Sequence, residues 1–160
     1  MLARLLPGLG HIQNLHPLFV HFPIGLIYAA AFLYLLGWIS GQQSIKWSAF
    51  WTLMLGGVSI AAALTSGLYA GPSVMVSDSV RQHLLVHHMH LMIASAIITG
   101  SLVVWALAAR PMPARGRTVF MAVFLLALVV IAMGADLGSA MVFGYNAGGD
   151  ACPQPIDFTH

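Results

Sequence analysis

TVFMAVFLLALVVIAMGADLGSAMVF, residues 118–143, decides the fold class, because Asp136 is its only ionisable residue. A helix that crosses the hydrocarbon core of a bilayer needs about 20 predominantly apolar residues. This stretch exceeds that length. It therefore predicts a transmembrane helix.

Three more stretches of this kind lie on the N-terminal side, at residues 83–109, 47–69 and 17–39. Glycine or proline closely follows each of them, as expected where helices end. The connecting segments are too short for soluble domains, and short connections make consecutive helices antiparallel neighbours. The predicted fold is all-α: an integral membrane up-down bundle of four transmembrane helices, a single domain over residues 1–160 with an outward-facing tail at 144–160.

The composition agrees with a membrane protein and excludes other classes. Hydrophobic residues make up 59% of the chain and charged residues 6%, against about a quarter charged in soluble domains. The net charge of +2 is too small for the clustered basic surface that nucleic-acid binding requires. The single cysteine, Cys152, can form neither an intrachain disulfide nor the motif of a covalently attached c-type haem, so any haem would be non-covalent.

The basic residues predict an orientation. The two loops that an even number of spans puts on one side hold four of them: Lys46, Arg110, Arg115 and Arg117. The other side holds two, Arg4 and Arg81. Because loops rich in lysine and arginine favour the cytoplasm, both termini are predicted to face outward, which is the periplasm for a bacterial inner membrane.

Seven of the eight histidines lie in two windows, at the starts of the first and third spans: His11, His16, His21, His83, His87, His88 and His90. The topology places both windows at the outer face. Ionisable side chains within membrane spans are costly, usually face the bundle interior and are functional candidates. Neutral imidazole is also the commonest metal ligand.

The spacing of the histidines places them on particular helix faces. On the third span, offsets of four and seven residues put His83, His87 and His90 on one stripe, with His88 turned about 100° from His87. On the first span, His16 precedes the helix and His21 lies about one and a half turns inside it. The third span therefore has a face of imidazoles, and His21 is the deeper histidine of the first span.

A non-covalent haem b needs two axial imidazoles from facing helices and an apolar slot between them. We predict His21 opposite His87 or His90 as the axial pair that binds the iron. A flat macrocycle needs open space beside His21, and Gly25, on the same helical face, leaves such a gap. Arg81 lies where a haem propionate would emerge. The candidate cofactor-binding residues are His16, His21, Gly25, Arg81, His83, His87 and His90.

Two other interpretations of the histidines stay open. A zinc or copper site would need three or four converging ligands, often including a carboxylate, and Asp136 lies near the outer end of the fourth span. Alternatively, the histidines are interfacial side chains that bond to carbonyls, lipid headgroups or a neighbouring subunit.

Two motifs resemble a known family. HPLFVHFPIGL, His16 to Leu26, is similar to the opening element of the small bacterial membrane family catalogued as domain of unknown function 2231, and AMVFGYNAGG, Ala140 to Gly149, resembles the end of its last span. The resemblance implies a four-span protein of the bacterial inner membrane, connected with cytochromes and respiratory chains.

The sequence favours electron transfer over independent catalysis. It contains no nucleophile and base pairing, no phosphate loop and no paired carboxylates. The leading hypothesis is a b-type haem-binding subunit of a larger respiratory or photosynthetic complex. It would pass electrons between the quinone pool and a periplasmic-side carrier, with other membrane or periplasmic subunits such as cytochromes as partners. The alternative is a cofactor-free accessory or assembly subunit that packs through small residues such as Gly134 and Gly138.

Overall fold

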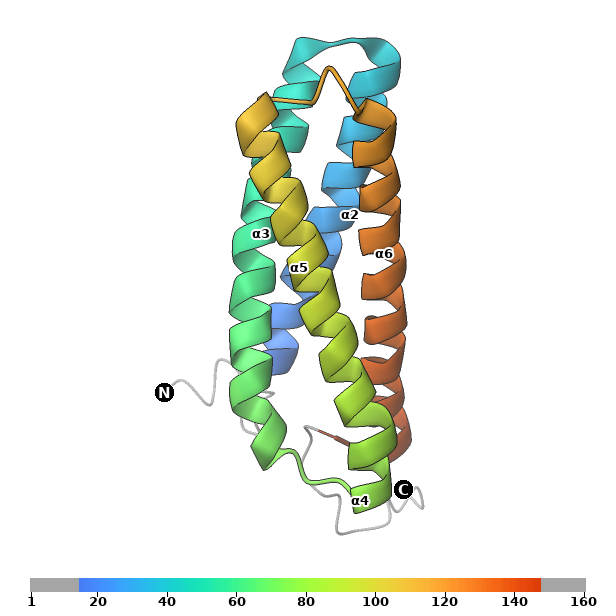
Figure 1. The fold of residues 1–160 in the computed structure, drawn as a ribbon. Helices are drawn as coiled ribbons and strands as arrows, with labels where there is room; N and C mark the ends of the chain where they lie inside the picture. The colour runs from blue at the N-terminus through green and yellow to red at the C-terminus, as the bar shows by residue number, and fades with distance from the viewer. Residues whose placement is uncertain (1–14, 148–160) are drawn as a thin grey trace, which may run out of the picture.

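The computed structural model describes residues 15–147, and its fold is an antiparallel bundle of four long helices (Figure 1). The helices are α2 (His16–Ser40), α3 (Gln43–Ala70), α5 (Val86–Ala109) and α6 (Arg117–Ser139). Shorter elements extend them: a 3-10 turn (Gly71–Ser73), the short helix α4 (Asp78–Val80), and π-helical turns at Arg81–Leu85 and Ala140–Gly144.

Each predicted span lies inside one continuous helical segment of the structure. These segments, 16–40, 43–73, 78–109 and 117–144, are long and apolar enough to cross a membrane. The third segment begins five residues before the predicted start, because Ser77 caps it: the Ser77 hydroxyl accepts a hydrogen bond from the Val80 amide at 3.4 Å. The predicted all-α bundle of four transmembrane helices is confirmed.

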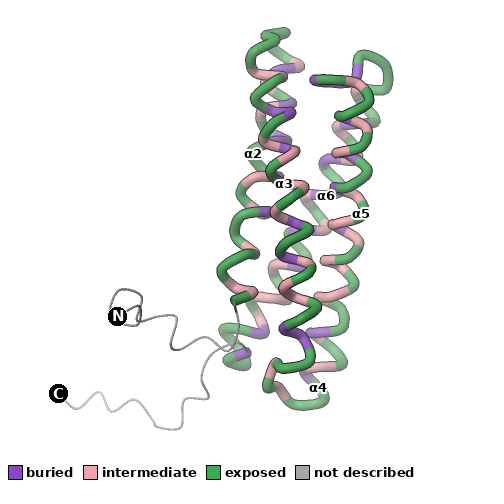
Figure 2. Tube along the Cα trace, turned by 90° about the vertical axis from the view of Figure 1, so that its left-hand side faces the viewer, coloured by how far each residue is buried: buried purple, intermediate pink, exposed green. Residues whose placement is uncertain are grey.

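The outer surface of the bundle is apolar along its whole length. Large side chains such as Phe22, Phe32, Val58 and Leu125 are each more than 60% exposed. Figure 2 shows that exposed residues recur along all four helices. Contiguous apolar surface of this extent is typical of contact with lipid rather than water. These features are those of a membrane protein.

The two ends of the bundle differ in charge. We call the end that carries Lys46, Arg110, Arg115 and Arg117 the cationic end. The opposite end, where α2 begins and where the chain turns from α3 towards α5, is the histidine end. Arg4, His11, Cys152 and most of the tail at 144–160 lie outside the described residues.

The half of the bundle near the cationic end is solidly packed. Tyr34 of α2 makes ring contacts with Phe120 and Phe124 of α6 at centroid distances of 5.1 and 5.6 Å, and all three side chains are fully buried. The Tyr34 hydroxyl donates to the Pro111 carbonyl at 3.0 Å. Halfway along the bundle, the Tyr28 hydroxyl donates to the Leu128 carbonyl at 3.0 Å, which links α2 to α6.

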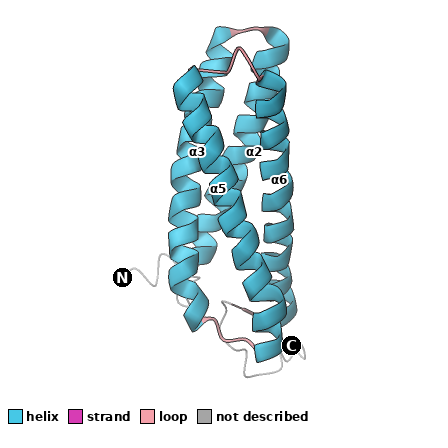
Figure 3. Ribbon diagram, viewed as in Figure 1, coloured by secondary structure: helices cyan, strands magenta, loops and turns pink. Residues whose placement is uncertain are grey.

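Helices are the only regular structure in the described part of the chain, as Figure 3 shows. Neighbours along the chain are neighbours in space, with α2 packed on α3 and α5 packed on α6. At the cationic end, the aromatic cluster lies between the two hairpins. At the histidine end they enclose the cavity described next.

Candidate functional site

A cavity of about 370 Å³ lies at the histidine end and is lined by all four long helices. Pockets that hold small molecules are commonly ~300–1,000 Å³ and mostly apolar, with a few convergent polar groups. The walls are mainly apolar side chains, including Ile24, Leu64, Met92, Ile131 and Met141. The polar side chains in the lining are three imidazoles and two serine hydroxyls: His16, His21, His88, Ser95 and Ser139.

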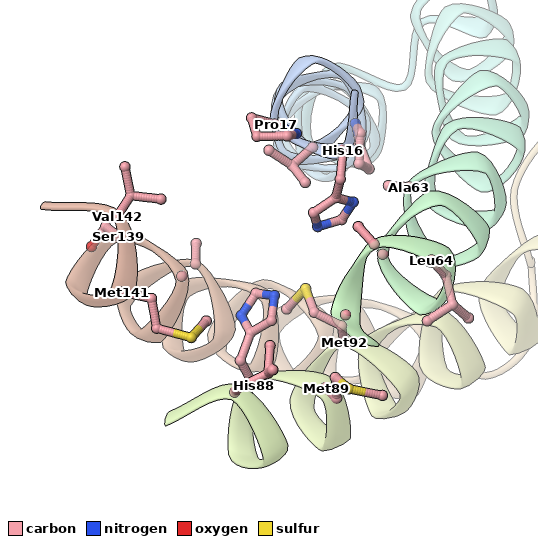
Figure 4. Close-up of a pocket in the computed structure, with 18 of the residues that line it drawn as sticks. His16, Pro17, Ala63, Leu64, His88, Met89, Met92, Ser139, Met141 and Val142 are labelled. Carbon is pink, nitrogen blue, oxygen red and sulfur yellow. The ribbon is translucent and has the colours of Figure 1, made fainter. Parts of the chain in front are cut away.

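Two of these imidazoles point into the cavity from different hairpins. His16, on the first turn of α2, and His88, near the start of α5, extend towards each other across the apolar space (Figure 4). Both side chains are half-buried. His88 lies on the α5 face that carries the fully buried Ser95 and Thr99, seven and eleven positions along the helix, so helical periodicity turns it inward.

A hydrogen bond from α6 fixes the His88 ring. Its Nδ1 lies 2.7 Å from the Gly134 carbonyl oxygen. A carbonyl can only accept, so Nδ1 must carry the proton, and in the neutral ring the lone pair lies on Nε2. A metal-binding histidine is usually oriented in this way, through its other ring nitrogen.

The His16 ring is fixed by α3 through a two-step hydrogen-bond chain. Its Nδ1 lies 3.0 Å from the Ser66 hydroxyl oxygen, and that hydroxyl donates to the Ala63 carbonyl at 2.9 Å. The Ser66 hydroxyl thus links the His16 ring to the backbone of α3. This link sets the orientation of the ring in the cavity.

Glycines make room for both rings. A Cβ atom built on Gly67 of α3 would lie 2.9 Å from His16 Cε1, and one built on Gly138 of α6 would lie 3.2 Å from His88 Cε1. A Cβ on Gly134 would clash with the Met92 methyl group. The small residues that the sequence suggests for helix packing thus also hold space for the imidazoles.

The family model described as predicted membrane protein (DUF2231) matches residues 12–151. The chain belongs to this family. The match confirms the resemblance drawn from His16 to Leu26 and includes both His16 and His88. No curated protein and no solved structure matches the chain.

In this DUF2231 protein, the predicted axial pair is not brought together. His21 is exposed at the rim of the cavity, and its Nδ1 donates to the Pro17 carbonyl of its own helix at 2.9 Å. His87 and His90 are exposed and do not line the cavity. Their assignment as ligands stays a prediction from spacing. Of the predicted histidines, His16 is the one whose ring enters the cavity.

The other predicted site residues lie as follows. His83 is exposed and outside the lining, and Gly25 is exposed with open space beside it. The Arg81 guanidinium donates to the Gly71 and Val74 carbonyls at 3.2 and 2.6 Å. Arg81 therefore braces the connection between α3 and α4, two residues of which line the cavity.

His88 is missing from the predicted site residues because the spacing of the histidines does not show which face of α5 points into the bundle. The predicted stripe is also altered by a local irregularity. The stripe of His83, His87 and His90 assumes regular α-helical spacing, but Arg81–Leu85 forms a π-helical turn, which adds a residue to that turn. His83 is thereby displaced from the stripe. A sequence signal could have identified His88: it lies on the same helical face as Ser95 and Thr99. Small polar residues are unusual on a lipid-facing surface, so they indicate the face that points into the bundle.

Within residues 15–147, no three histidine, cysteine, aspartate or glutamate side chains are grouped so that they could hold a metal ion. Asp136 is exposed and does not line the cavity. The polar groups beside the inward-facing histidines are instead Ser66 and the Gly134 carbonyl. Two imidazoles point into the cavity, His16 and His88, whereas a zinc or copper centre uses three or four converging ligands.

Proposed function

We propose that this protein is a b-type haem-binding subunit of the bacterial inner membrane, with His16 and His88 as the axial ligands. The observation that carries the proposal is the pair of imidazoles, from two different hairpins, that point into one apolar cavity and are each oriented by a hydrogen bond at Nδ1. A haem iron already has four porphyrin nitrogens and needs only two protein ligands, which bis-histidine sites supply.

The types of residue in the cavity suit such a group. His16 and His88 are oriented by hydrogen bonds to Ser66 and the Gly134 carbonyl, and Gly67 leaves space beside the first ring. When bound, the haem supplies an iron that gains and loses one electron. The protein contributes ligand orientation and apolar walls that exclude water and tune the redox potential.

The cationic end supports an orientation for the proposal. Its four basic residues favour the cytoplasm, so the histidine end and the cavity would face the periplasm. Electrons would then pass between the quinone pool and a carrier at the periplasmic side, within a larger respiratory or photosynthetic complex. Cytochromes carry electrons and are therefore suitable partners for this transfer.

A visible spectrum of the purified full-length protein, made with ample haem, tests the proposal. We expect reduced-minus-oxidised bands of a six-coordinate haem b, which His16→Leu or His88→Leu should abolish. His87→Leu, one residue away on the exposed face of α5, tests the spacing-based assignment and should keep the spectrum. A featureless spectrum from folded wild-type protein after haem addition would overturn the proposal, as would loss of haem in His87→Leu alone.

A second function is favoured by one feature of the same site. Both imidazoles bond to a neighbouring helix, since His16 reaches α3 and His88 reaches α6. They could thus serve only to tie helices together in a cofactor-free accessory or assembly subunit. In that case, His16→Leu and His88→Leu would lower thermal stability, and no haem spectrum would be obtained from any variant.

A further inference from the structure

The rim of the cavity carries its own set of polar and aromatic groups. His21 of α2 and Ser139 of α6 are exposed residues of the lining. Val142, Phe143 and Leu68, also in the lining, are 45%, 88% and 49% exposed. Residues that both line a cavity and are exposed mark its mouth, which here joins the start of α2 to the end of α6.

The mouth lies within apolar surface. Leu18 and Phe22 flank His21 on α2 and are 48% and 63% exposed, as expected for side chains that contact lipid. The Tyr28 to Leu128 hydrogen bond joins α2 to α6 halfway along the bundle, and the mouth lies on the histidine side of that link. A ligand dissolved in the outer leaflet would therefore reach the cavity from the membrane.

Backbone carbonyls determine which atoms of the side chains at the mouth donate hydrogen bonds and which accept them. His21 Nδ1 donates to the Pro17 carbonyl at 2.9 Å, which leaves the lone pair of the neutral ring on Nε2. The Ser139 hydroxyl donates its one proton to the Asp136 carbonyl at 2.8 Å, which leaves its oxygen as an acceptor. The two side chains at the mouth thus offer acceptors, and a complementary ligand must donate.

We propose that the mouth binds a membrane-dissolved quinol in preference to the corresponding quinone, with His21 Nε2 as the acceptor for one quinol hydroxyl. A quinol has two O–H donors on an apolar aromatic ring, whereas a quinone has carbonyl acceptors only. A bound quinone would place its carbonyl oxygens, which can only accept hydrogen bonds, against the acceptor atoms of His21 and Ser139. The exposed Phe143 ring and Val142 supply apolar surface for the headgroup.

The reaction of the bound quinol rests on the proposed haem, although the binding does not. Oxidation to the quinone breaks both O–H bonds and releases two protons and two electrons. The proton of the hydroxyl bonded to His21 passes to Nε2 and then to water at the histidine end, and the proton of the other hydroxyl passes to water directly. A haem held by His16 and His88 would supply the one-electron acceptor, and two successive transfers would be needed for each quinol. His21 is therefore a proton acceptor in contact with the substrate, and not an iron ligand.

Anaerobic binding of duroquinol and duroquinone to the full chain in nanodiscs tests the preference. We expect duroquinol to bind about tenfold more tightly, the upper range for one net hydrogen bond. His21→Leu should remove most of that difference, and Ser139→Ala should reduce it by a smaller factor. Ser101→Ala is the matched control, because Ser101 is also an exposed serine bonded to a carbonyl of its own helix, at 2.9 Å, but lies outside the lining.

Haem content, read from the spectrum of the same samples, separates this proposal from the previous one. His88→Leu should lack haem and still prefer duroquinol, whereas His21→Leu should keep haem and lose the preference. Equal binding of the two probes by wild-type protein would overturn the quinol site and leave the haem proposal standing. Loss of haem in His21→Leu would overturn the division of roles and support His21 as a ligand.

Discussion

The two halves of this bundle are built from the same four helices but are packed differently. Near the cationic end, Tyr34, Phe120 and Phe124 fill the interior, and each is fully buried. Near the histidine end, the interior contains a cavity of about 370 Å³ between two imidazoles. Lipid tails are as apolar as leucine, so close packing has to hold membrane helices together. The comparison indicates that the aromatic half supplies stability and that the hollow half can hold a ligand.

Phe124→Ala should have the largest effect on stability. Removing a buried phenylalanine side chain costs about 3–5 kcal/mol in soluble proteins. We expect roughly 3 kcal/mol, because the surrounding lipid is apolar and the transfer contribution is smaller. Reversible unfolding in mixed micelles measures the loss. Haem content of the remaining folded protein should be unchanged, and a selective loss of haem would contradict the division between the halves.

Gly67→Ala should have an intermediate effect, and it acts on the hollow half. The added methyl group would lie 2.9 Å from His16 Cε1, and overpacking of this kind costs about 1–3 kcal/mol. We expect weaker haem retention together with a lower unfolding free energy. Gly100→Ala is the matched control: Gly100 lies within α5 with no atom near its Cβ position, so this change should be neutral or slightly stabilising. Equal effects of the two changes would contradict the role assigned to Gly67.

Ser66→Ala should have the smallest effect on stability and a specific effect on the ligand. It removes the hydroxyl that orients the His16 ring at 3.0 Å, and loss of such a partner lowers metal affinity by about 10- to 100-fold. Haem titration of the apoprotein measures the affinity. Thr65→Val alters the neighbouring residue, whose hydroxyl bonds to its own helix, and should leave the affinity unchanged. An unaltered affinity in Ser66→Ala would remove Ser66 from the site.

The sequence predicted the architecture well because a bilayer imposes strong constraints on composition. All four spans follow from apolar stretches between charged residues, and each lies within a helix of the structure. The gathering of histidines at one end follows from the same topology. The sequence also placed His16 among the candidates, although it gave His21 the leading role.

What only tertiary structure decided is which imidazoles face each other. The π-helical turn at Arg81–Leu85 changes the phase of His83, and the buried face of Ser95 and Thr99 turns His88 inward. Partners distant in sequence then fix the inward-facing rings, as the Gly134 carbonyl does for His88 across 46 positions. The length of an apolar stretch is a local property, which can be read directly from the sequence. The facing of two side chains depends on how neighbouring helices rotate and approach each other, and that is settled by packing of the whole bundle.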